Sequence, residues 1–127
     1  MTLKQKLANL VVAALLALVM QVAAHAGEAD VLRAVATASG DQYRFDVTIR
    51  SNDKGWDYYC DRFEIVAPNG DVLGTRVLLH PHETEQPFTR SLGGVVIAPS
   101  IKTVTVRAKM KPSGAGGETV SISLPGR

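Results

Sequence analysis

Several short segments of the chain alternate apolar and polar residues, and this period of two constrains the fold more than any other feature. Residues 43–50 read YRFDVTIR, with a large apolar side chain at every second position. Alternation of this kind predicts a β-strand with one buried and one solvated face. The same pattern occurs at residues 62–65, 103–108 and 119–124, and more weakly at 31–38 and 89–97.

Turn signals separate these segments. Pro68, Asn69, Gly70 and Asp71 predict a turn, after which Val72–Leu79 would return as the partner strand of a hairpin. Residues 31–38 predict an edge strand, although their alanine content also allows a short helix. Counting about seven short strands in about 100 residues, we expect an all-β protein with one antiparallel β-sandwich, immunoglobulin-like or fibronectin III-like.

The first 26 residues have the pattern of a cleaved secretory signal peptide. Lys4 and Lys6 precede an apolar run over residues 10–20, and Ala24-His25-Ala26 supplies the small residues of a cleavage site. The run is shorter than the roughly 20 residues that span a bilayer, so we expect no membrane span after cleavage. No cysteine stands at the cleavage site for lipid attachment. These features predict a single domain over residues 27–127, periplasmic or secreted.

The net charge of the chain indicates little about its partners once the leader is removed. The sequence has 14 Lys and Arg against 12 Asp and Glu, and two of the lysines, Lys4 and Lys6, belong to the leader. The remaining charges balance, which gives no electrostatic reason to expect nucleic acid or an anionic membrane as a partner. The partner expected is an unidentified protein or small-molecule ligand, and the oligomeric state stays open.

The segment Ser51–Asp61 is rich in aromatic side chains. It holds Trp56, the sole tryptophan, together with Tyr58, Tyr59 and Cys60. Clustered aromatics in a loop predict a ligand platform. The alternative is that Trp56 and one tyrosine plug the open end of the sandwich, while Asp53 and Asp57 bind backbone amides of the turn.

The segment LLHPHETEQPFTRSL, residues 78–92, contains two histidines. His80 and His82 flank Pro81, which keeps the backbone extended, so both imidazoles should point the same way. They could bind copper or zinc. The alternative is that His80 ends a strand with one hydrogen bond while His82 and both glutamates face water. The possible further ligands are Glu83, Glu85, Met110 and Cys60.

Phe88 predicts an anchor that returns the chain to the core, and Arg90 predicts an ion pair with Glu83 or Glu85. Catalysis has little support, because the chain has no Gly-x-Ser-x-Gly elbow and no histidine near Cys60 in the sequence. The single cysteine is expected to be buried. Because the sequence offers no activated nucleophile, we expect no enzyme.

The glycine-rich stretch 111–117 predicts a flexible turn in the last hairpin.

The stretch Gly55–Leu92, GWDYYCDRFEIVAPNGDVLGTRVLLHPHETEQPFTRSL, resembles the central segment of a group of small exported bacterial proteins of unassigned function. The shared pattern is GWDxYxD, then LGxRxLxHPHxxEQPFTRSL. In that group histidine stands at the positions of Ser51 and Tyr58, and alanine at that of Cys60. The resemblance implies an exported sandwich domain in which Cys60 is dispensable, and it implies no activity.

Together these features predict an exported periplasmic β-sandwich that acts as a binding or accessory module. Two alternatives remain: a periplasmic copper or zinc carrier using His80 and His82, and an assembly protein that pairs through an edge strand. The expected ligand or partner surface comprises His80, His82, Glu83, Glu85, Arg90, Trp56 and Tyr58.

Overall fold

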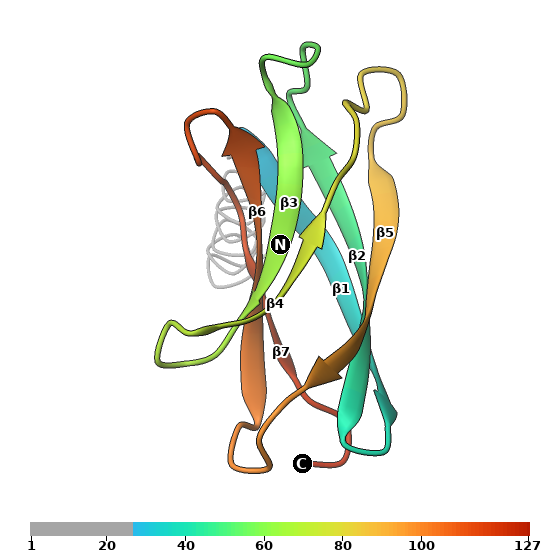
Figure 1. The fold of residues 1–127 in the computed structure, drawn as a ribbon, viewed down its shortest axis with the longest axis vertical. Coiled ribbons are helices and arrows are strands. Elements are labelled where there is room, and N and C mark those ends of the chain that lie inside the picture. The colour runs from blue at the N-terminus through green and yellow to red at the C-terminus, as the bar shows by residue number, and fades with distance from the viewer. Residues whose placement is uncertain (1–26) are drawn as a thin grey trace, which may run out of the picture.

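The computed structural model describes residues 27–127, and the predicted leader lies outside them. Seven strands form two antiparallel sheets that face each other (Figure 1). One sheet has the order β1-β2-β5 and the other β4-β3-β6-β7. The strands are β1 (Ala29–Ser39), β2 (Gln42–Ser51), β3 (Tyr59–Val66), β4 (Val72–Val77), β5 (Phe88–Val96), β6 (Thr103–Lys111) and β7 (Val120–Ser123). The predicted seven-stranded β-sandwich is confirmed.

The fourth strand decides between the two predicted types of sandwich. In a constant-type immunoglobulin domain it would pair with the fifth strand, in the sheet of the first two. Here β4 pairs with β3 instead, in the sheet of β6 and β7. The strand order is therefore the fibronectin III-like one.

The core lies between the two sheets and follows the alternation in the sequence. Along β2, Tyr43, Phe45, Val47 and Ile49 are buried, whereas the side chains between them are exposed or half-buried. Side chains from the facing sheet complete the core, among them Phe63, Ile65, Val106 and Met110. Cys60 is a free cysteine with 0% exposure, as predicted.

Most strand predictions are confirmed, with small changes of extent. Residues 31–38 belong to β1, which is an edge strand and not a helix. The predicted strand Val72–Leu79 ends earlier, at Val77, although the Leu78 N–H still bonds to the Asp61 carbonyl at 2.8 Å. The part of the chain that the structure describes contains no helix long and apolar enough to cross a membrane.

β4 and β5 lie side by side at one side of the sandwich, where the two sheets meet. A Cβ on Gly74 of β4 would lie 3.1 Å from Leu92 Cδ2 and 3.2 Å from Val95 Cγ2, so only glycine fits there without displacement of a side chain. Arg76 of β4 also donates to the Ser91 carbonyl at 3.0 Å. This side of the sandwich is therefore closed by direct contact between the sheets.

The connections between strands gather at two opposite ends (Figure 1). At the loop end lie the β2–β3 loop (residues 52–58), the β4–β5 loop (residues 78–87) and the β6–β7 loop (residues 112–119). At the turn end lie the β1–β2 turn, the β3–β4 turn and the β5–β6 loop. Both segments singled out in the sequence are thus brought to the loop end.

Candidate binding surface

A buried carboxylate ties the β2–β3 loop to the β4–β5 loop. The Asp53 side chain has 0% exposure. Its Oδ1 accepts hydrogen bonds from the Ser51 hydroxyl at 2.7 Å and the Cys60 N–H at 2.8 Å. Its Oδ2 accepts from the His82 N–H at 2.8 Å, across the gap between the loops. Asp53 thus binds backbone amides as predicted, but those of β3 and of the β4–β5 loop instead of those of its own turn, and Asp57 is exposed.

The Gln86 side chain joins the same two segments a second time. Its carbonyl oxygen accepts from the Ser51 N–H at 2.9 Å. Its amide nitrogen donates to the His82 carbonyl at 2.9 Å and to the Ser51 hydroxyl at 3.2 Å. Because these bonds use backbone groups of both segments, the loops are held in one conformation relative to each other.

His82 is buried, which corrects the alternative in which it faces water. Its ring stacks on Phe88, with 4.0 Å between ring centroids and 7° between ring planes, and its exposure is 4%. Phe88 is the core anchor that the sequence predicts, and its position on β5 places this flat apolar surface beneath the imidazole. Burial, and next the nearby Arg90 guanidinium, lower the pKa of His82.

The contacts of the His82 imidazole determine which ring nitrogen carries its hydrogen. Arg90 Nη2 lies 3.0 Å from His82 Nε2, and a guanidinium can only donate, so Nε2 accepts. The neutral ring then carries its hydrogen on Nδ1. This atom is buried without a hydrogen-bond partner, and the nearest carboxylate oxygen, Asp53 Oδ2, is 3.9 Å away.

His80 is exposed and lies against the His82 ring, with 4.4 Å between the centroids. The prediction that both imidazoles point the same way is confirmed. His80 Nδ1 lies 2.9 Å from the Pro81 carbonyl, the one hydrogen bond expected of it. His80 does not end a strand as predicted, because β4 ends at Val77. Two of the further ligands considered, Cys60 and Met110, are buried in the core. Among residues 27–127, no group of three or more His, Cys, Asp and Glu side chains could hold a metal ion.

The charged residues of the β4–β5 loop lie at the surface around this stack. Arg90 Nη1 is 3.1 Å from Glu85 Oε1, which confirms the predicted ion pair with Glu85. Glu83 is exposed and faces the other loop, since a Cβ on Gly55 would lie 3.8 Å from its Oε1. Arg90 therefore contacts both the buried imidazole and the exposed Glu85.

Trp56 is 62% exposed, so the prediction that it plugs the end of the sandwich is wrong. Tyr59 is buried in its place, and the edge of one ring meets the face of the other at 5.8 Å between centroids. The half-buried Tyr58 hydroxyl donates to Glu28, and this bond, with burial next, raises the pKa of Tyr58. Trp56 and Leu79, the latter 75% exposed, are the two most exposed large apolar side chains of residues 27–127.

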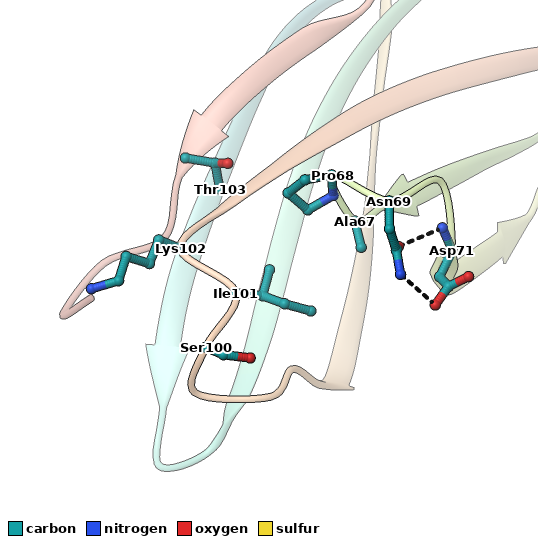
Figure 2. A pocket seen from close by; sticks show the side chains of 8 residues that line it. All are labelled: Ala67, Pro68, Asn69, Asp71, Ser100, Ile101, Lys102 and Thr103. Atoms are coloured by element: carbon teal, nitrogen blue, oxygen red, sulfur yellow. Dashed lines mark hydrogen bonds between the residues drawn. The ribbon is translucent and has the colours of Figure 1, made fainter.

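The turn end has a feature that the sequence did not indicate. An open hollow with a volume of about 450 Å³ lies between the β3–β4 turn and the β5–β6 loop. Figure 2 shows its lining side chains, with Ile101 pointing toward Ala67 and Pro68. The segment 68–71 forms the predicted turn, with Asn69 bonded to Asp71 at 3.0 Å. This turn forms one wall of the hollow, and residues 100–103, which are distant in the sequence, form the other. The lining residues are Ala67, Pro68, Asn69, Asp71, Ser100, Ile101, Lys102 and Thr103.

Arg127 holds the β5–β6 loop at the turn end. Its guanidinium donates to the carbonyls of Ile97 at 2.7 Å and Ile101 at 3.1 Å, and also to that of Ala98. It lies over the Tyr43 ring, 5.1 Å from the centroid. The loop is therefore held by a cation that binds carbonyl groups.

Comparison with known proteins finds a relative in Halomicrobium mukohataei named "Putative lipoprotein", 36% identical over 86 residues. The match includes 68% of this chain and 42% of the relative, so the chain spans less than half the length of that protein. No family model matches the chain. No solved structure matches it either. The chain is thus distantly homologous to this protein, without a family assignment.

Proposed function

We propose that this protein is an exported, periplasmic β-sandwich that binds a partner protein through its loop end. Two observations support export. Residues 1–26 have the pattern of a cleaved leader. The relative in Halomicrobium mukohataei is named a lipoprotein, and lipoproteins are exported proteins. The single cysteine, Cys60, lies far from the predicted cleavage site, where a lipoprotein would carry its lipid-bearing cysteine.

The observation that carries the proposed binding role is the exposure of Trp56 on a loop that is otherwise fixed. Exposed aromatic side chains on a rigid support are typical anchors of protein interfaces, because they bury a large area and lose little conformational entropy. The bonds of Asp53 and Gln86 hold the supporting loops in place before a partner arrives. Leu79, at the same end, adds a second exposed apolar side chain.

The proposed role involves no chemistry of its own. Burial is the main cause that raises the pKa of the Cys60 thiol to about 12. Such a thiol is protonated at neutral pH and is therefore a poor nucleophile. The buried imidazole, that of His82, is engaged by Arg90 and Phe88.

Site-specific crosslinking of the exported protein tests this function. A photo-crosslinking phenylalanine analogue would replace Trp56, and in a matched control it would replace Val96, which is 61% exposed at the turn end. We expect a covalent adduct of one defined mass at position 56 in the periplasm and none at position 96. Absence of an adduct at 56, or the same adduct at both positions, would refute the proposal.

Edge pairing is a second candidate function, and the length of β1 favours it. β1 has 11 residues at an edge, and Leu32 and Val35 on it are each 40% exposed. Its first three residues are buried and the Val31 N–H bonds to the Glu118 carbonyl, so the part of the edge that can accept a strand from another chain begins at Leu32. A native mass of two or more chains, reduced to one by Val35→Lys and not by Val72→Lys, would support this function.

A further inference from the structure

The N-terminal end of the sandwich contains a buried carboxylate, that of Asp30, which is 2% exposed. Its Oδ1 accepts hydrogen bonds from the Gly27 N–H at 2.9 Å and the Glu118 N–H at 2.7 Å. Its Oδ2 accepts from the same Gly27 nitrogen at 3.0 Å. None of the ion pairs between residues 27–127 includes Asp30. A buried carboxylate without a cation is costly, even when amides satisfy it.

Three glycines allow the backbone to approach this carboxylate. A Cβ on Gly27 would lie 2.3 Å from Gly117 Cα, and a Cβ on Gly117 would lie 2.1 Å from Asp30 Oδ1. A Cβ on Gly116 would lie 2.8 Å from the Ala108 carbonyl. No other residue fits at these positions without displacing backbone. The glycine-rich β6–β7 loop, which the sequence predicts only as a flexible turn, thus forms one wall of a fitted site around the Gly27 nitrogen.

Further bonds hold the first residues against the same wall. The Glu28 N–H donates to the Gly116 carbonyl at 3.2 Å, and the Val31 N–H donates to that of Glu118 at 2.8 Å. The Glu28 carbonyl accepts from the Asn52 N–H at 3.0 Å. The position of the Gly27 nitrogen is therefore set from both sides.

The leader pattern places the new chain terminus at this nitrogen. Cleavage after Ala26 would use one water molecule, whose hydroxyl joins the Ala26 carbonyl carbon and whose proton joins the Gly27 nitrogen as the peptide bond breaks. At neutral pH the new amine takes up a second proton from solvent and becomes an α-ammonium group. That cation would arise 2.9 and 3.0 Å from the two Asp30 oxygens, if the backbone keeps its place.

We propose that Asp30 and its glycine wall form a binding site for the α-ammonium group of Gly27, so that removal of the leader completes and stabilises the fold. This inference rests on the exported, cleaved state in the proposed function. An amide hydrogen bond then becomes a charge-assisted ion pair in a buried site, which is the stronger interaction. Maturation would supply the cation that Asp30 lacks in the precursor.

The test uses protein exported from the full-length precursor. Intact mass gives the cleavage position. The matched variant has one serine inserted between Ala26 and Gly27, which moves the ammonium group away by one residue. Asp30→Asn, with and without the insertion, completes a double-mutant cycle that separates the ion pair from crowding of the extra residue.

We expect the mature chain to begin at Gly27 and the insertion to raise the unfolding equilibrium constant about tenfold to a hundredfold, the range for a charged hydrogen bond. Asp30→Asn removes the carboxylate of the ion pair. In this background the insertion should therefore change the unfolding equilibrium constant less than about threefold, which is within the usual error of such cycles. An equal effect in both backgrounds would overturn the inference. If Asp30→Asn fails to fold, absence of any effect of the insertion overturns the inference, and the pH dependence of the difference between the two chains separates the ion pair from crowding.

A pH series adds a readout of charge. Pairing with Asp30 would raise the pKa of the α-amino group above its ordinary value of about 8. The stabilisation is then complete below about pH 8 and is lost as pH rises through the raised pKa. Glu28 and Glu118 flank the site and Tyr58 bonds to Glu28, so the inserted variant, which keeps all three, is the proper reference. A stability difference between the two chains that stays constant from pH 7 to 10 would overturn the inference.

The cleavage position separates the two proposals. A retained leader contradicts both the exported state and the binding site. Cleavage elsewhere contradicts the binding site alone, as does cleavage after Ala26 without coupling to Asp30.

Discussion

The two ends of the sandwich are held together by opposite chemistry. At the loop end the buried Asp53 carboxylate accepts bonds from the backbone amides of Cys60 and His82. At the turn end the Arg127 guanidinium, partly open to solvent, donates to carbonyls of the β5–β6 loop. The difference matters because an acceptor removed from the interior leaves buried amides without partners, whereas carbonyls near the surface can bond to water.

The two ends also differ in shape. The loop end displays Trp56 and Leu79 outward, and the turn end is hollowed between Ala67 and Ile101 (Figure 2). Protruding apolar side chains suit a partner protein, and a concave site of about 450 Å³ has the volume of a small-molecule site. The loop end, with its protruding apolar side chains, is thus the one that we expect to dock with a partner protein.

The largest expected effect is that of Asp53→Ala. It leaves two buried amides unbonded, so the free energy of unfolding should fall by about 2–4 kcal/mol. Urea denaturation followed by far-ultraviolet circular dichroism measures this change. Asp71→Ala is the matched control, because Asp71 is exposed and bonds only within its own turn, and we expect a change within about 0.5 kcal/mol. Equal losses in both variants would contradict the central role of Asp53.

The next effect is that of Arg127→Ala at the turn end. It removes the bonds to three carbonyls, of which those of Ala98 and Ile101 belong to residues that are not buried, so we expect a loss of about 1 kcal/mol in the same assay. Arg44→Ala, which removes an exposed surface ion pair with Asp46, serves as control and should change stability less. If Arg127→Ala costs more than Asp53→Ala, the proposed difference between the ends is wrong.

A smaller effect appears in the dependence of stability on pH. Burial and Arg90 lower the pKa of His82 in the folded state, so folding favours its neutral form. Its contribution is present above the unfolded value of about 6.5 and is lost as pH falls through the lower folded pKa. Between pH 7 and 5 the wild type should therefore lose more stability than His82→Gln does. Arg90→Gln should show a shallower loss than wild type, and identical slopes in all three proteins would rule out this role of His82.

The smallest expected effect is on metal content. His82 Nε2 already accepts from Arg90, and the described residues supply no group of three ligands. Native mass spectrometry after addition of copper or zinc should show no ion retained in stoichiometric amount. One retained ion per chain, lost in a His80→Ala, His82→Ala variant, would favour the carrier function instead.

The fold could be predicted from the sequence because alternation reports which face of a strand is buried, as residues 43–50 show. The pairing of β4 with β3 also agrees with the turn signal at residues 68–71, since a tight turn joins neighbouring strands. The extent of β4 could not be predicted. Apolar residues continue to Leu79, although the strand ends at Val77 and the Leu78 N–H makes one further bond to β3.

The site was less predictable, because burial of a loop residue depends on what lies beneath it. The spacing of His80 and His82 predicts that they share a side, but only the position of Phe88 on β5 makes that side the interior for His82. Trp56 and Tyr59 are both large aromatic residues of one segment, so the sequence alone does not tell which of the two is buried. Likewise, Gly116 and Gly117 suggest flexibility in the sequence, and their close contact with Gly27 and Asp30 is a property of the folded chain.

The exposure of Trp56 decides what the protein's own fluorescence reports. Trp56 is the sole tryptophan, and it is 62% exposed in the folded state. Its indole is therefore hydrated before unfolding as well as after it, so its emission should shift little when the sandwich melts. Contact with Tyr59 is the main native influence on the ring. Intrinsic emission should consequently be a weak probe of folding and a sensitive one for any molecule that covers the loop end.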